Sequence, residues 1–300
     1  MAGCWAVPYL RKCVQLPVGT KAKPVTTYSD LLPVAFEAVT IASRLMRSCS
    51  PGVLTAKDDR DMTSEADFLV EREVRALLRQ RTPAIGFWGE EEGVTGDNDN
   101  LFWAFDPIDG TVNFIRNIPL CGTSLGLIEQ GRPKLGVIDL PFLDARYSAL
   151  EGEGAYLGSR RISVSRTTDL HDAVVGIGDY AVGQDAEKKN RLRVAVTHQL
   201  AKNVQRVRMN GSAAVDLAWL SDGKLDASIT LANHPWDIAA GVAIAREAGA
   251  VVMDRDGTDH NLYSRATIVT TPDLTDALLA LLCEAENSAV AKTGHGSEAD

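Results

Sequence analysis

The pattern of apolar and polar positions changes character partway along the chain. Apolar residues recur every three or four positions over about residues 31–45 and again over residues 66–77, which predicts two helices. The charge-dense stretch between them, residues 57–67, is interpreted as a loop that leads into the second helix. Short apolar runs bounded by turn residues then predict a series of strands. These strands are expected at residues 85–88, 102–105, 125–128, 135–140, 146–150, 154–157 and 161–164.

From about residue 170 the pattern alternates between short apolar strands and longer helices. Strands are expected at residues 174–177, 225–231, 251–253 and 266–270, and helices at residues 185–201, 214–220, 237–248 and 272–283. Such alternation is typical of an α/β unit. The fold class is therefore α/β with an α+β first half, divided into subdomains of residues 29–168 and 169–285. Residues 1–28 are expected to form a poorly ordered extension, and residues 286–300 a disordered tail.

The run from Phe102 to Phe114 carries the most informative polar residues. Its apolar strand is expected to end at Asp106-Pro107, because proline lacks an N–H and restricts the residue before it. Asp106 and Asp109 would then stand on a tight turn, where two carboxylates can converge on one point. Hard oxygen ligands arranged in this way suit Mg²⁺ or Mn²⁺.

Two neighbours of these aspartates suit an anion and a water molecule. Gly110 lets backbone N–H groups approach an anion closely, and Thr111 supplies a hydroxyl that could orient a water. Metal-assisted hydrolysis of a phosphate ester uses this combination. A turn capped by the two aspartates explains the run equally well, so the rest of the chain must decide.

Three further acidic residues stand at predicted element ends. Glu90 follows the strand at residues 85–88, Asp67 lies in the first turn of the second helix, and Asp237 begins a helix after Pro235. Helix capping and the helix dipole are sufficient to explain Asp67 and Asp237. Two adjacent strand ends that carry carboxylates nevertheless make a better metal site than either alone. The small residues 211–213 open a helix, which suits the approach of an anion or sugar.

Charge and composition argue against two kinds of partner. Lys and Arg number 31 against 40 Asp and Glu, giving a net charge of −9, whereas nucleic-acid binding favours a basic face. No apolar run reaches the roughly 18 residues that a membrane span requires. The five cysteines are widely spaced and odd in number, so a reduced, cytoplasmic chain is expected.

Residues 122–126 match the G-x-S-x-G motif of serine hydrolases. That motif requires a helix directly after the serine. The residues after Ser124 are expected to form a strand and a hairpin instead, which argues against a serine nucleophile.

Four separated motifs together resemble the inositol monophosphatase family, the lithium-sensitive Mg²⁺-dependent sugar phosphatases. The motifs are residues 57–67, 89–91, 106–114 and 236–241, and the resemblance covers about residues 29–283. It implies phosphoric monoester hydrolysis on a layered αβαβα sandwich of the inositol monophosphatase and fructose-1,6-bisphosphatase type. Many members are dimers, so a homodimer is an expectation, with a small phosphorylated metabolite as the other partner.

The resemblance also implies a ligand set for two to three Mg²⁺ ions, with Mn²⁺ as a substitute. Glu90, Asp106 and the carbonyl oxygen of Ile108 would hold one ion. Asp106, Asp109 and Asp237 would hold a second.

Further roles follow from the same resemblance. Asp67 and Glu90 would hold a weaker third ion through waters. Thr111 and Glu90 would position and activate the attacking water, beside Asp106 as a third catalytic residue. The backbone N–H groups of Gly110 and Thr111 would bind the phosphate oxygens.

The resemblance leaves the substrate open. Asp109, Ser212, Ala213 and Asp237 match positions that touch the substrate. Inositol-specific members carry a glutamate seven residues before the aspartate of the Trp-Asp motif, whereas this chain has Thr230 there. A sugar or cyclitol phosphate similar to inositol 1-phosphate is the leading expectation. Fructose 1,6-bisphosphate, histidinol phosphate and 3′-phosphoadenosine 5′-phosphate are alternatives, as is a non-catalytic sugar-phosphate-binding protein on the same fold.

Overall fold

The structure, a computed structural model, describes residues 27–58, 61–96, 100–232 and 234–291. Most of the predicted extension and the end of the predicted tail therefore lie outside the described residues. The prediction that a tail begins at residue 286 is wrong, because helix α7 (Thr275–Ala291) continues through residues 286–291. The stretch contains Ala289 and Ala291, and alanine favours a helix. Ala285, just before it, is fully buried.

The N-terminal region forms two helices joined by a strand ribbon. The elements are η1 (Tyr28–Asp30), α1 (Leu32–Ser48), β1 (Leu54–Asp58), β2 (Asp61–Ser64) and α2 (Glu65–Arg81). Strands β1 and β2 pair antiparallel where a loop was expected. Residues 54–57 of β1 are exposed, and the buried residues of β2, Thr63 and Ser64, are polar. The ribbon therefore lacks the apolar alternation by which strands are predicted.

The larger sheet has eight strands in the order β10-β9-β8-β7-β6-β5-β3-β4. Neighbouring strands are antiparallel except β3 and β5, which are parallel. Their bounds are β3 (Gly86–Gly89), β4 (Gly93–Thr95), β5 (Leu101–Asp109), β6 (Gly122–Glu129), β7 (Arg132–Leu140), β8 (Ala145–Leu150), β9 (Gly154–Leu157) and β10 (Arg160–Ile162).

Strand β5 continues through Pro107 to Asp109, so the expected end at Asp106 is wrong. The pairing with β3 stops at Phe105, and the register with β6 shifts between Asp106 and Asp109. Pro107 therefore occupies an irregular stretch of the ladder where its missing N–H is tolerated.

The smaller sheet has five strands in the order β12-β11-β13-β15-β14. Strand β11 is parallel to β12 and β13, and β15 is antiparallel to β13 and β14. The strands are β11 (Val174–Ile177), β12 (Arg206–Arg208), β13 (Ala227–Thr230), β14 (Val251–Met253) and β15 (Thr267–Thr270). The remaining helical elements are α3 (Thr111–Ile115), α4 (Ala186–Asn203), α5 (Ala213–Ser221), α6 (Pro235–Glu247), η2 (Pro141–Leu143), η3 (Leu170–Asp172) and η4 (Pro272–Leu274).

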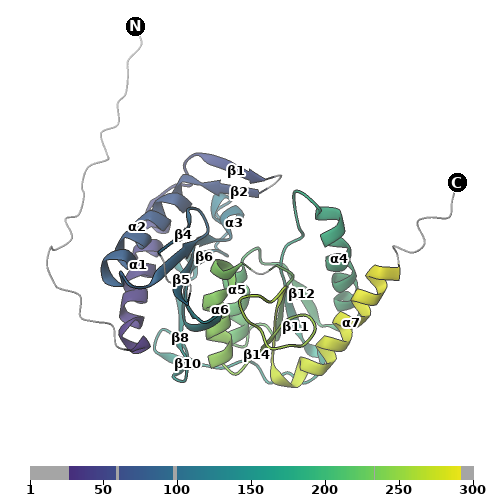
Figure 1. The fold of residues 1–300 in the computed structure, drawn as a ribbon. Coiled ribbons are helices and arrows are strands. Elements are labelled where there is room, and N and C mark those ends of the chain that lie inside the picture. Colours follow the sequence, from purple (N-terminus) through teal and green to yellow (C-terminus); the bar gives the residue numbers. More distant parts are fainter. Residues whose placement is uncertain (1–26, 59–60, 97–99, 233, 292–300) are drawn as a thin grey trace, which may run out of the picture.

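The two sheets and three pairs of helices stack in five layers (Figure 1). Helices α1 and α2 cover the outer face of the larger sheet, α5 and α6 fill the space between the sheets, and α4 and α7 cover the smaller sheet. Close approach of α6 to the larger sheet requires Gly136, where an added Cβ would lie 2.3 Å from the carbonyl oxygen of Ala240. The αβαβα sandwich predicted from the sequence is confirmed.

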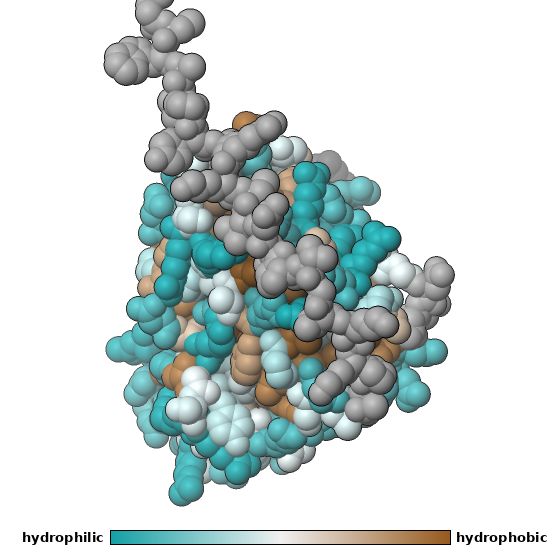
Figure 2. Space-filling view, turned by 90° about the vertical axis from the view of Figure 1, so that its left-hand side faces the viewer, coloured by the Kyte–Doolittle hydropathy of each residue, from teal (hydrophilic) through white to brown (hydrophobic). Residues whose placement is uncertain are grey.

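The surface is mixed in character. Figure 2 shows one face on which hydrophilic residues predominate, with hydrophobic residues among them. Within the part of the chain that the structure describes, no helix combines the length and the apolar character that crossing a membrane demands.

Candidate active site

A cavity of about 620 Å³ opens between the two sheets, where strand ends meet the first turns of α3, α5 and α6. Ligands of layered α/β proteins commonly bind at such strand ends. All of the candidate site residues except Asp67 line this cavity. They are Glu90, Asp106, Ile108, Asp109, Gly110, Thr111, Ser212, Ala213 and Asp237.

Three carboxylates converge in the cavity. One oxygen each of Glu90, Asp106 and Asp237 lies within 4.8 Å of the others, although the residues come from three separate elements. Asp106 is only 3% exposed. Burial and the charges of Glu90, Asp109 and Asp237 raise the pKa of Asp106 well above its ordinary value. A cluster of like charges at this separation suits a bound cation.

Asp109 is held by the first turn of α5, outside this group of three. Its Oδ2 accepts a hydrogen bond from the backbone N–H of Ala214 at 2.8 Å. Burial raises the pKa of Asp109 to about 6, while hydrogen bonds from Ser212 and Ala214 oppose the increase. Ser212 and Asp109, which were both expected to touch the substrate, thus contact each other.

Gly110 is required by its backbone conformation. It adopts a φ of +87°, and a Cβ added to it would lie 3.1 Å from the carbonyl oxygens of Gly211 and Leu120. A side chain here would strain both the backbone and this contact.

Thr111 and Asp67 are joined by a hydrogen-bond chain behind the cavity. The Thr111 hydroxyl lies 3.1 Å from the carbonyl oxygen of Ile108 and 3.2 Å from Asp67 Oδ1. The other oxygen of Asp67 accepts from the backbone N–H of Ser64 at 3.0 Å and from the Ser64 hydroxyl. Asp67 therefore caps α2 in a capping box, as expected of its place in the first turn, and also orients Thr111.

Lys57 holds the glutamates of the β3–β4 turn, a role that sequence reasoning missed. Its Nζ lies 2.7 Å from Glu90 Oε1 and 2.7 Å from Glu91 Oε1. Burial opposes the charge of Lys57, but the two glutamates outweigh it and raise the pKa of the lysine. Burial also raises the pKa of Glu91 to about 7. The charge density of residues 57–67 was visible in the sequence, but it did not show which residues Lys57 would contact.

Glu71 supports the same turn from α2 and was also missed. Its carboxylate accepts from the backbone N–H groups of Glu91 and Glu92 at 2.8 and 2.9 Å, and from Arg75 Nη2 at 2.5 Å. Gly89 passes so close that an added Cβ would lie 2.4 Å from this carboxylate. Glu71 falls on the apolar face of the predicted helix, and a charged residue there was a detectable signal.

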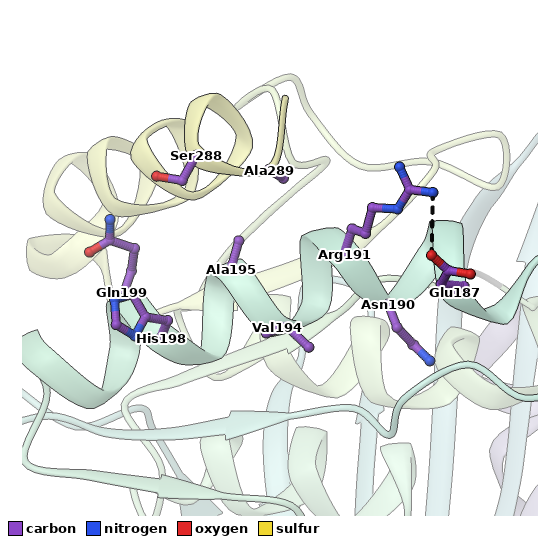
Figure 3. Close-up of a pocket in the computed structure, with 9 residues that line it drawn as sticks. All are labelled: Glu187, Asn190, Arg191, Val194, Ala195, His198, Gln199, Ser288 and Ala289. Atoms are coloured by element: carbon purple, nitrogen blue, oxygen red, sulfur yellow. Dashed lines mark ion pairs between the residues drawn. The ribbon is translucent and has the colours of Figure 1, made fainter. Parts of the chain in front are cut away.

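Ser124 is fully buried within β6, and no helix follows it. The G-x-S-x-G match is therefore not a nucleophile elbow, as predicted. A further cavity, of about 540 Å³, lies between α4 and α7 (Figure 3). Its lining shares no residue with the acidic cavity.

Comparison with known proteins gives consistent matches. The model of the inositol monophosphatase family matches residues 27–288. Inositol-1-monophosphatase from Mycolicibacterium smegmatis is 35% identical over 226 residues, covering 75% of this chain and 82% of that protein. A Thermotoga maritima protein named fructose-1,6-bisphosphatase/inositol-1-monophosphatase is 34% identical, with 75% and 84% covered. The solved inositol monophosphatase from Anabaena (Nostoc) superposes with a TM-score of 0.77 at 31% identity, with 86% and 97% covered.

The five-layered fold and its carboxylate cavity are those of a metal-dependent phosphoric monoester hydrolase. Within that class, the chain belongs to the inositol monophosphatase family, because the match extends over most of its length. The family resemblance predicted from the four motifs is confirmed.

Proposed function

We propose that the protein is a Mg²⁺-dependent phosphomonoesterase that hydrolyses a small sugar or cyclitol phosphate by attack of a water molecule. The observation that carries the proposal is the convergence of Glu90, Asp106 and Asp237 in one cavity of a phosphatase fold. Water attack needs no covalent intermediate. Ser124 is fully buried in β6 and does not line this cavity.

The residues present fit a hard divalent cation. The donor set consists of carboxylate oxygens. Burial and the repulsion of neighbouring carboxylates raise the pKa of Asp106, and a bound cation would relieve that repulsion. Glu90, Asp106 and Asp237 would hold Mg²⁺, or Mn²⁺ in its place, together with Asp109 and the carbonyl oxygen of Ile108. When bound, the metal stabilises negative charge on the phosphoryl group and makes water a stronger nucleophile.

Asp67 would contribute with Glu90 to a third ion, through waters. It lies behind the cavity lining, so its direct contact is with the Thr111 hydroxyl, 3.2 Å away.

The protein groups supply orientation and a proton acceptor. The Thr111 hydroxyl has one proton, which it donates to Asp67 or to the Ile108 carbonyl oxygen. Its lone pairs are then free to accept from the attacking water and fix its direction. As the water oxygen bonds to phosphorus and the ester P–O bond breaks, Glu90 accepts the second proton of the water and the leaving oxygen takes a proton from solvent. The N–H groups of Gly110 and Thr111 bind the phosphate oxygens. Lys57, 2.7 Å from Glu90, holds this glutamate in place.

Inositol 1-phosphate is the substrate class to test first. The named activities of the similar proteins from M. smegmatis and T. maritima support it. Thr230 lines the cavity at the position where inositol-specific members carry a glutamate, so the panel must also contain fructose 1,6-bisphosphate, histidinol phosphate and 3′-phosphoadenosine 5′-phosphate. Inhibition by Li⁺, a homodimer and a cytoplasmic location stay predictions.

The test is phosphate release from this panel with and without Mg²⁺. We expect that chelation abolishes turnover and that Asp106→Asn lowers kcat/KM by at least about a hundredfold, since it removes a charge central to the cluster. Asp139→Asn is the matched control, because Asp139 is a buried aspartate of the same sheet that pairs with Arg146 outside the cavity. Near-normal Mg²⁺-dependent turnover by Asp106→Asn would refute the site.

A further inference from the structure

The cavity has two walls of opposite charge. The carboxylate cluster occupies one wall, contributed by the larger sheet and α6. Lys189 and Arg193, one turn apart on α4, line the same cavity from the side of the smaller sheet. Neither residue belongs to the four family motifs.

Arg193 is fixed in position by backbone carbonyl oxygens. Its guanidinium donates to the carbonyl oxygens of Asp179 at 3.2 Å, Lys189 at 3.3 Å and Leu231 at 3.1 Å. No described carboxylate forms an ion pair with it, and burial lowers its pKa. Three of its five N–H groups are thus used, which leaves one on each terminal nitrogen. A half-buried cation held in this way is ready to bind an anion.

A second cavity of about 420 Å³ adjoins this wall. It shares Lys189, Arg193 and Leu231 with the first cavity. The charged residues of its lining are five bases and one acid, in a chain whose net charge is −9. They are Lys188, Lys189, Arg193, Arg255, Arg265 and Asp185.

The fold explains why these bases meet. Thr230 at the end of β13 pairs with Thr267 at the start of β15, and Met253 at the end of β14 pairs with Ile268. Arg255, just after β14, and Arg265, just before β15, therefore emerge at one edge of the sheet. Helix α4 lies across that edge, and Glu286 alone among the described carboxylates pairs with Arg255, at 3.5 Å.

We propose that Arg193 and Lys189, with the basic cavity behind them, bind a second phosphoryl group of the substrate. This rests on the proposed function, because it takes the scissile phosphate to lie at the carboxylate wall. The natural substrate is then a small sugar or cyclitol bisphosphate, whose second phosphoryl group remains on the product. Guanidinium and ammonium groups are the side chains that recognise phosphate in proteins.

The test measures kcat/KM for matched pairs of esters with Mg²⁺. Inositol 1,4-bisphosphate is compared with inositol 1-phosphate, and fructose 1,6-bisphosphate with fructose 1-phosphate. We expect the unaltered protein to prefer the bisphosphate of each pair by at least about tenfold. Arg193→Gln and Lys189→Gln should each lower this ratio about tenfold, which corresponds to about 1.4 kcal/mol, mainly through KM.

Arg191→Gln is the matched control. Arg191 is an exposed base on the same helix that pairs with Glu187 and lies outside both cavities. The control removes the same charge and should leave the ratio unchanged. Lys189 is exposed at the cavity wall, so Lys189→Gln should leave the fold intact. If Arg193→Gln does not fold, the result for Lys189→Gln decides the test.

The outcomes separate this inference from the proposed function. Absence of Mg²⁺-dependent turnover on every ester overturns both. Turnover with equal kcat/KM for the two esters of each pair overturns the second phosphoryl site alone. That site is also overturned when Lys189→Gln leaves the ratio unchanged, as Arg191→Gln should. A preference for a sugar phosphate with a carboxylate in place of the second phosphate would overturn the phosphoryl assignment.

Discussion

Glu71 and Asp106 lie in neighbouring parts of the same half of the molecule and are both removed from water, yet their surroundings differ. Glu71 is fully buried and accepts hydrogen bonds from Arg75 and from two backbone N–H groups. Asp106 is 3% exposed and faces the carboxylates of Glu90 and Asp237.

The difference separates a structural acid from a functional one. The Arg75 guanidinium and two backbone N–H groups satisfy Glu71, which therefore fixes the turn that carries Glu90. Other carboxylates surround Asp106, so the folded chain contains a repulsion between like charges that a bound cation can reduce. Burial alone would not have distinguished the two. The comparison predicts opposite effects on stability when each acid is removed.

The largest expected effect is that of Glu71→Ala. It leaves the Arg75 guanidinium and two backbone N–H groups without their acceptor, so we expect a loss of about 3–5 kcal/mol in the free energy of unfolding. Urea denaturation would measure it. Glu73→Ala, an exposed site two residues away, should change the value by less than about 0.5 kcal/mol. Equal effects of the two variants would show that Glu71 does not support the turn.

Asp106→Asn should act in the other direction. In metal-free buffer at pH 8 it removes repulsion among the clustered carboxylates, and we expect unfolding to require about 1 kcal/mol more than for the unaltered chain. Urea denaturation with a chelator would measure the gain. Adding Mg²⁺ should stabilise the unaltered chain and narrow the difference. A loss of stability without metal would contradict the comparison.

Asp216 provides an intermediate case, in which the expected effect depends on pH. It is buried and accepts one hydrogen bond, from Asn210 Nδ2 at 2.6 Å. Burial raises its pKa to about 7. Between the ordinary value near 4 and about 7, the folded chain holds a proton that the unfolded chain has lost. The contribution of Asp216 to stability is therefore full below this window and disappears as the pH rises through 7.

Asp216→Asn removes this dependence. We expect the variant to gain stability relative to the unaltered chain between pH 5 and pH 8, in denaturation curves recorded at both values. A difference that is the same at both pH values would show that Asp216 is already ionised at pH 5.

The acidic residues of the site that could be predicted from the sequence stand where an apolar run ends or a helical pattern begins. Each of Asp106, Glu90 and Asp237 was expected at the end or start of a recognisable element. The neighbouring strands β3 and β5 and the first turn of α6 bring them together. The strands at residues 154–157, 174–177 and 251–253 have the predicted bounds because each is a short apolar run between turn residues.

Other features depend on contacts between distant parts of the chain. Lys57 falls in a stretch that was interpreted as a loop, and Arg193 falls in a predicted helix; neither pattern indicates which residues they contact. Only the packing of α4 over the strand ends makes Arg193 part of a cavity wall. The β1–β2 ribbon was not predicted because the residues that it buries, Thr63 and Ser64, are polar.

The capping box of α2 has a consequence for motion. Ser64, Asp67 and Thr111 form one hydrogen-bond chain. Fraying of the first turn of the helix would therefore break the hydrogen bond between Asp67 and the Thr111 hydroxyl. Helix ends are usually the first segments to open in a folded protein. Because we propose that Thr111 orients the attacking water, we expect this opening to lower turnover on warming at temperatures below the melting temperature.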